Sequence, residues 1–183
     1  LPVWQALDVA HQLLKQLACV HSTGMVHRDV KPSNVMMSSS GNTQLFDFNN
    51  AGEIGKDSYG QPVGTAQYRP PEQVRGDSVF KSSDLYSLGI VLYQMLAGQN
   101  PMEMKTREAT HVEQCSTLLP RFVVNTIRRR LAPINNVQEV VLREVVDKLN
   151  AFIQKMTAKN MADRYQSAGE ALVDLEEIMK LWE

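Results

Sequence analysis

The sequence has little cysteine, few aromatic residues and no long apolar run. Only 2 of its 183 residues are cysteines, Cys19 and Cys115, and 7% are aromatic. The cysteines lie far apart without metal-ligand spacing, so we expect no disulfide framework and reduced thiols that pack as small hydrophobic side chains. No stretch approaches the roughly 20 apolar residues of a membrane span, and no signal peptide is recognisable. These absences predict a cytoplasmic protein, with any membrane anchor lying outside this segment.

The sequence also lacks an excess of charge of either sign. It has 19 Lys and Arg against 20 Asp and Glu, a formal net charge of -1. We therefore expect no nucleic-acid partner, because no overall basic field is present. The only dense basic run, 128–130, is interpreted as a solvated helix face, with a docking or phosphate-binding patch as the alternative. His11, His21 and His111 show no metal spacing and are expected at the surface or in packing.

What is present is 43% hydrophobic residues, enough for one folded domain with a sizeable core. Helical spacing of leucines predicts an amphipathic helix over 2–22, and the strongly apolar stretch 83–97 predicts a buried central helix that ends at Gly98. From about 137 onward, two further helical blocks are expected, with a break near 158–160.

Two shorter apolar runs, 35–37 and 44–46, flank a serine-rich stretch. They predict a small β-hairpin with Gly41-Asn42 in its turn. Residues 49–76 show no sustained periodicity and are expected to form a long functional loop. The predicted fold class is therefore α+β, predominantly α-helical, with a small β-hairpin insertion that carries the candidate chemistry.

That chemistry is suggested by His27-Arg28-Asp29-Val30-Lys31-Pro32-Ser33-Asn34, which is followed by Asp47-Phe48-Asn49. Phosphoryl transfer needs an oriented hydroxyl, neutralised charge and Mg²⁺ held against the phosphates. Asp29 could accept the hydroxyl proton, and Lys31 could place positive charge beside the moving phosphoryl group. Asn34 and Asp47 offer the oxygen ligands that Mg²⁺ prefers.

This pattern resembles the catalytic loop and metal-binding segment of protein kinases. The resemblance implies ATP and Mg²⁺ as cofactors, Asp29 as the catalytic base, and Lys31 in contact with the transferred phosphate. It implies that Asn34 and Asp47 bind the metal. It further implies that His27 packs structurally, with Phe48 in the core beside it.

Other segments resemble the same family, so the resemblance covers nearly the whole sequence. Residues 64–72 look like the end of an activation segment that starts near Asp47, with Pro70 where alanine is common. Residues 84–89 resemble the start of the central helix, which implies that Asp84 holds the catalytic-loop backbone. Residues 160–165 resemble the late arginine segment, which implies that Arg164 pairs with Glu72.

Details of the resemblance address the substrate and regulation. Lys31 and Thr65 resemble serine/threonine kinases and imply a protein substrate with a Ser or Thr acceptor. Residues 30–34 and 163–168 resemble bacterial-type members of the family. Arg28 is expected to gather a phosphorylated loop residue, for which Ser58 is the candidate; an ordinary exposed serine is the alternative. Met36 is expected to form part of the adenine floor, with ordinary core packing left open.

The sequence departs from the family pattern in two respects. Asn49 stands where glycine is usual, and asparagine is among the residues that best tolerate the left-handed region. No glycine-rich loop, strand lysine or partner glutamate occurs in residues 1–183. In the family these belong to the smaller N-terminal lobe.

We therefore expect that 1–183 is a C-terminal lobe whose N-terminal lobe belongs to the same parent chain, and that the lobe alone transfers phosphate negligibly. The alternative is a pseudokinase or kinase-derived scaffold that binds partners without catalysis. A kinase-like enzyme acting on small molecules is a third reading. Retention of Asp29, Lys31, Asn34 and Asp47 together argues against a scaffold, which has no chemical need for all four.

Overall fold

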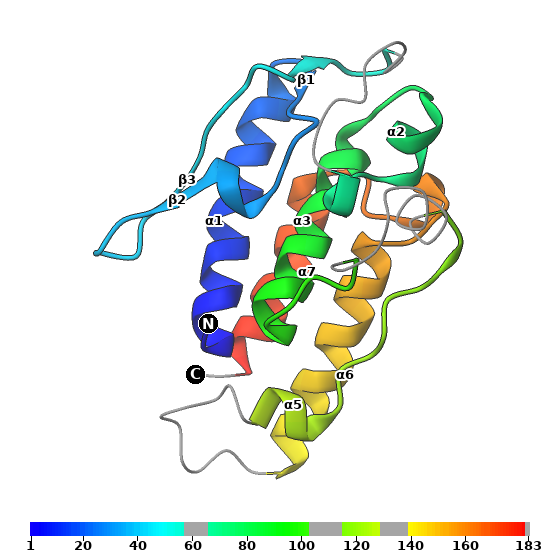
Figure 1. Ribbon diagram of the computed structural model, residues 1–183. Coiled ribbons are helices and arrows are strands. Elements are labelled where there is room, and N and C mark those ends of the chain that lie inside the picture. The colour runs from blue at the N-terminus through cyan, green and yellow to red at the C-terminus, as the bar shows by residue number, and fades with distance from the viewer. Residues whose placement is uncertain (57–65, 103–114, 129–138, 182–183) are drawn as a thin grey trace.

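The structure is a computed structural model that describes residues 1–56, 66–102, 115–128 and 139–181. Four long helices dominate it, as Figure 1 shows: α1 (Val3–Ser22), α3 (Lys81–Ala97), α6 (Glu139–Met156) and α7 (Ala168–Lys180). The shorter helices are α2 (Pro71–Arg75) and α5 (Val124–Arg128), with 3-10 turns at Pro32–Asn34, Ala66–Tyr68 and Met161–Asp163. The strands β1 (Met25–Val26), β2 (Val35–Met37), β3 (Thr43–Leu45) and β4 (Gly52–Glu53) form two small antiparallel pairs. The predicted mostly helical α+β fold is confirmed.

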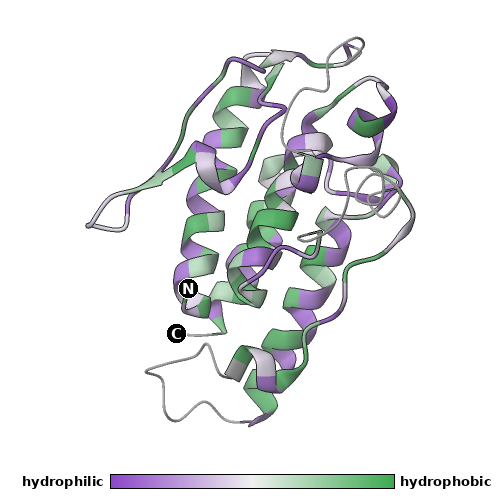
Figure 2. Ribbon diagram, in the orientation of Figure 1, coloured by the Kyte–Doolittle hydropathy of each residue, from purple (hydrophilic) through white to green (hydrophobic). Residues whose placement is uncertain are grey.

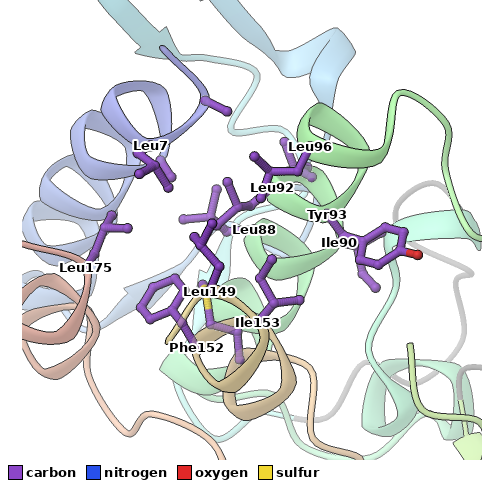
Figure 3. Close-up of a cluster of buried hydrophobic side chains, with 14 of the residues drawn as sticks. Leu7, Leu88, Ile90, Leu92, Tyr93, Leu96, Leu149, Phe152, Ile153 and Leu175 are labelled. Carbon is purple, nitrogen blue, oxygen red and sulfur yellow. The ribbon is translucent and has the colours of Figure 1, made fainter. Parts of the chain in front are cut away.

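Helix α3 is the centre of the core. Helices α1 and α6 both pack against it, and α7 packs against α1 and α6 (Figure 1). Side chains from all four helices meet in one cluster around Leu88, Leu92 and Leu96 (Figure 3). Every residue from Ser82 to Tyr93 is buried, polar ones included, so this part of α3 has no solvent-facing stripe. The helix is coloured as hydrophobic along much of its length in Figure 2. Burial on all sides is what a continuous apolar stretch predicts.

The hairpin is fixed to helix α1 by side chains. Strand β2 pairs with β3 in the register Val35 to Leu45, and the hairpin projects beside α1 in Figure 1. The side-chain oxygens of Gln12 and Gln16 accept the β3 backbone N–H groups of Thr43 (2.7 Å) and Leu45 (2.8 Å). The outer edge of β3 is therefore satisfied by α1, which gives this short pair the support that an isolated hairpin lacks.

The hairpin turn is present, but the prediction that Gly41-Asn42 makes it is wrong. The N–H of Gly41 donates to the Ser38 carbonyl (3.0 Å), and Gly41 has φ 86°. A left-handed conformation is accessible to glycine at no steric cost. Because the turn is closed between Ser38 and Gly41, its two central residues are Ser39 and Ser40.

The prediction of a continuous loop over 49–76 is partly wrong. Strand β4 pairs with β1 in the register Val26 to Gly52, and α2 ends at Gly76, which caps it in the left-handed conformation. Elements of two to five residues show no periodicity, and their pairing partners lie elsewhere in the sequence, so a local pattern cannot reveal them. Helix α5 was not predicted for the same reason.

The expected packing of the cysteines is wrong. Cys19 is exposed and Cys115 is partly exposed, and both are free thiols. Cys19 lies on the solvent side of α1, whose buried face is already filled by aliphatic residues. In the part of the chain that the structure describes, no helix has the length and apolarity needed to cross a membrane.

Candidate active site

Asp84, in the first turn of α3, binds the backbone of the loop between β1 and β2. The two carboxylate oxygens of this buried residue each accept one backbone N–H, from His27 and from Arg28, both at 2.8 Å. His21, at the end of α1, contacts the same carboxylate at 2.8 Å through Nε2. A carboxylate only accepts hydrogen bonds, so His21 Nε2 carries the proton. The structure thus contains the contact between Asp84 and the loop backbone that the resemblance implied. It also adds His21 to this contact; in the sequence, the only indication was that His21 lies a few residues before the loop.

Arg28 occupies a strained backbone conformation at this point. Its φ is 66°, in the left-handed region that costs a non-glycine residue about 1–2 kcal/mol. Asp84 holds its N–H, and the side chain of Gln73 in α2 donates to its carbonyl at 3.0 Å. The Arg28 guanidinium lies against Gly52, where any side chain would collide with it. Gln73 and Gly52 were not predicted, because their roles depend on contacts across the fold.

The carboxylate of Asp29 is surrounded by nitrogen donors. It is 5% exposed, and its Oδ2 contacts Lys31 Nζ at 2.7 Å, Asn34 Nδ2 at 3.1 Å and Asn50 Nδ2 at 3.2 Å. Asn34 also donates to the Asp29 backbone carbonyl at 2.9 Å. A buried carboxylate requires such partners, because an unpaired buried charge is very costly. The structure therefore brings Asp29, Lys31 and Asn34 together, and it adds Asn50.

Asn34 and Asp47 are positioned by adjoining pieces of backbone. The N–H of Phe46 donates to the Asn34 carbonyl at 3.0 Å, which places the residue before Asp47 beside Asn34. The Asn34 amide nitrogen donates to the backbone carbonyl and to the carboxylate of Asp29, and the Asn34 Oδ1 is the atom suited to a cation. One amide oxygen and one carboxylate match the sparse protein ligation of Mg²⁺, which keeps waters and substrate phosphates. Among the described residues, no group of three or more His, Cys, Asp or Glu side chains forms a denser metal site.

The backbone after Asp47 differs from the expectation based on Asn49. Among the described non-glycine residues, positive φ occurs only at Arg28 and at Asp47 (62°). Asn49 therefore does not use the left-handed tolerance of asparagine. Its N–H instead donates to Asp47 Oδ1 at 3.3 Å, closing a short turn around the carboxylate.

His27 and Phe48 pack together, but not both in the core. His27 is fully buried, Nε2 contacts the Phe46 carbonyl at 3.1 Å, and Nδ1 accepts the Asp29 N–H at 3.3 Å. The Phe48 ring meets the His27 ring edge-on at 4.8 Å between centroids, yet Phe48 is 48% exposed. The expectation that Phe48 lies in the core is wrong, because only one side of its ring is covered by His27.

Met36 lies on the open side of strand β2. It is 60% exposed, so the core-packing alternative for this residue is wrong. With Met37 and polar hairpin residues it lines a shallow hollow on the surface. Ser58, Thr65, His111 and Arg129-Arg130 lie outside the described residues.

Beneath the site, Glu72 and Arg164 form a buried ion pair. Arg164 donates to both Glu72 oxygens, at 2.7 and 2.8 Å, and both side chains are fully buried. Ser83 of α3 donates to the same Glu72 carboxylate at 2.7 Å. The Arg164 guanidinium lies over the Tyr86 ring, 4.8 Å from its centroid, and burial raises the pKa of the Tyr86 hydroxyl. This pair ties α2 to α3 and to the segment before α7.

Comparison with known proteins shows which protein family has this arrangement. Residues 1–175 match the protein kinase domain family. The chain belongs to the protein kinase family. It is 32% identical over 183 residues to a probable serine/threonine-protein kinase of Clostridium perfringens, covering 98% of this chain and 24% of that protein. It is 35% identical to the serine/threonine-protein kinases PknB of Mycobacterium leprae (96% of this chain, 26% of that protein) and Mycobacterium tuberculosis (93% and 26%).

The chain therefore spans about a quarter of the length of these curated relatives. The similarity supports a kinase of the serine/threonine type.

Proposed function

We propose that this chain is the C-terminal lobe of a serine/threonine protein kinase, which transfers the γ-phosphate of ATP to a Ser or Thr hydroxyl of a protein substrate. The observation that carries the proposal is the environment of Asp29. Its buried carboxylate lies 2.7 Å from Lys31 Nζ, on a loop whose backbone is held by Asp84. The serine/threonine kinases to which the chain is similar support the substrate class.

In this proposal each site residue has one task. Asp29 accepts the proton of the acceptor hydroxyl and orients its oxygen for attack. Lys31 neutralises charge on the transferred phosphoryl group. Because Lys31 already contacts Asp29, both groups reach the same reacting centre.

Asn34 and Asp47 are the residues that would hold Mg²⁺. When bound, the metal neutralises phosphate charge and fixes the phosphate position. The exposed Met36 would support the adenine ring from below. The proposal places the enzyme in the cytoplasm, because it would use ATP.

The nucleotide must also be bound from the side opposite this lobe. In this proposal an N-terminal lobe of the same parent chain supplies the glycine-rich loop and lysine that residues 1–183 lack. The lobe alone would position ATP poorly, because positioning supplies much of the rate enhancement in phosphoryl transfer.

Regulation and acceptor choice would involve the segment that follows Asp47. Arg28 is the proposed partner of a phosphorylated residue such as Ser58, and Thr65 the proposed contact near the base. The guanidinium of Arg28 reaches the Glu53 carbonyl at 3.3 Å, which places it beside the start of this segment. Phosphopeptide mapping of active enzyme that finds Ser58 unmodified would remove the regulatory part.

The test is labelled phosphate transfer from ATP to a generic basic protein by the full-length protein that contains this chain. We expect Asp29→Ala to lower the rate about 10²- to 10⁴-fold, the usual contribution of a general base, and Asp47→Ala to lower it severely. Asp147→Ala is the control, since Asp147 is 78% exposed on α6. Equal transfer by wild type and Asp47→Ala would refute the mechanism. Robust transfer by residues 1–183 alone would refute the need for a second lobe.

A second candidate is a scaffold that binds partners without catalysis. The retention of Asp29, Lys31, Asn34 and Asp47 together argues against it, because a scaffold has no chemical need for all four. A wild-type protein that binds partners but transfers no phosphate would favour it.

A further inference from the structure

The contact between Asn50 and Asp29 has no counterpart among the residues already assigned a task. Asn50 Nδ2 lies 3.2 Å from Asp29 Oδ2, the same oxygen that Lys31 and Asn34 approach. Lys31 and Asn34 belong to the loop that carries Asp29. Asn50 comes from a different segment, 21 residues along the chain.

The position of Asn50 is determined on both sides. Before it, Asp47 has a left-handed backbone, and the N–H of Ala51 donates to the Phe48 carbonyl at 3.0 Å to close a turn. After it, Gly52 pairs with Val26 of β1. The turn and the strand pair leave Asn50 between two fixed points, partly buried and facing the loop of Asp29.

We propose that Asn50 is a positioning residue for the base, so that the segment after Asp47 sets the orientation of the Asp29 carboxylate. The inference rests on the proposed kinase function. A carboxylate rotates readily about its last bond, and a lysine on a flexible four-carbon stem holds it weakly. The two short amides, Asn34 from one segment and Asn50 from another, fix the plane of the carboxylate from two directions. A displacement of the segment after Asp47 then removes one of these donors from the base.

The kinetic test compares two near-isosteric variants of the full-length protein. Asn50→Leu removes the donor, and Asn50→Asp replaces it with a second carboxylate that repels Asp29. Loss of a hydrogen bond to a charged group corresponds to about a tenfold effect or somewhat more. We expect kcat to fall about tenfold in Asn50→Leu and further in Asn50→Asp, with the KM for ATP unchanged.

The control is Asn125→Leu, the same exchange at an exposed position of α5. It should keep the wild-type kcat. Wild-type kcat in both Asn50 variants would overturn the inference. So would a fall in kcat that is matched by a rise in KM for ATP, since that would indicate disturbed nucleotide binding.

A second measurement does not depend on activity. In the full-length protein, the side-chain amide signals of Asn50 are identified by their loss in Asn50→Leu. We expect Asp29→Ala to shift these NMR signals and to speed their hydrogen exchange, while Asp147→Ala leaves them in place. Signals unaffected by Asp29→Ala would overturn the inference. A wild-type protein without phosphate transfer would instead overturn the proposed function, and the amide signals would still decide whether Asp29 holds Asn50.

Discussion

At the scale of single residues, buried carboxylates organise this molecule in different ways. Asp84 uses its two oxygens on backbone N–H groups at 2.8 Å and so fixes the shape of a loop. The Asp29 carboxylate is instead contacted by side-chain donors, Lys31 and Asn34 among them. Glu72 is fully paired with Arg164. Each is stable inside the protein because donors replace the water it has lost.

The Glu72–Arg164 pair gives a prediction about stability. Glu72→Gln leaves Arg164 buried without its counter-charge, and we expect unfolding free energy to fall by about 3–5 kcal/mol. Urea denaturation followed by circular dichroism measures the change. The control is Glu53→Gln, because Glu53 and Lys56 form a pair that is 69% exposed on both sides. Such pairs contribute at most about 1 kcal/mol. Similar losses in the two variants would contradict the structural role of Glu72.

At the scale of elements, the packing of α3 against α6 depends on a glycine. A Cβ at Gly89 would lie 2.7 Å from Thr157 Cγ2 and 2.9 Å from Met156 Cβ. The latter atom is attached directly to the α6 backbone, so the two helices would have to move apart. Because Asp84 lies on the same helix as Gly89, the loop that carries Asp29 depends on how α3 is seated.

Gly89→Ala therefore tests packing against helix propensity. Alanine favours a helix over glycine by about 1 kcal/mol, but overpacking costs typically about 1–3 kcal/mol. We expect a net loss of stability in thermal and urea unfolding. Gly169→Ala on α7 is the matched control, since its Cβ would meet only Ser167 Oγ at 3.8 Å. That variant should be neutral or slightly more stable. A stabilised Gly89→Ala would show that α3 and α6 are not in the close contact described.

At the scale of the whole molecule, apolar side chains lie exposed on strand β2 and at the start of α1. Met36 and Met37 on β2 are 60% and 44% exposed, and Trp4 at the start of α1 is 50% exposed. Gln5, beside Trp4 on α1, contacts the Met37 sulfur at 3.9 Å, so the hairpin and the start of α1 adjoin. Exposed apolar side chains that gather in one place usually mark a contact surface.

This surface predicts self-association of residues 1–183. We expect the double variant Met36→Gln and Met37→Gln to sediment more as a monomer than wild type at the same concentration. Val173→Gln on α7 is the control, because Val173 is 58% exposed on a different helix. Analytical ultracentrifugation distinguishes them. An equal degree of association in wild type and both variants would show that Met36 and Met37 do not form the surface through which the chain self-associates.

Some of this could be predicted from the sequence because the signals are local. The helices over 3–22 and 81–97 follow from the spacing of apolar residues, and the Gly98 stop follows from the freedom of glycine in the left-handed region. The predicted break between the last two helices lies where α6 ends and the 3-10 turn Met161–Asp163 intervenes. The order and spacing of Asp29, Lys31, Asn34 and Asp47 pointed to the protein kinase family, which the comparisons confirm.

The sequence by itself determined the four long helices, the hairpin strands and the grouping of Lys31 and Asn34 with Asp29, because these depend on near neighbours in the chain. Only the tertiary structure decided that Asn50, Gln73 and His21 join the site, since each acts across 21 or more residues. It also decided that the strained backbone falls on Asp47 and not Asn49, and that Phe48 is half exposed. Burial and long-range hydrogen bonding are properties of the packed chain, and no local pattern specifies which distant donor meets a given carboxylate.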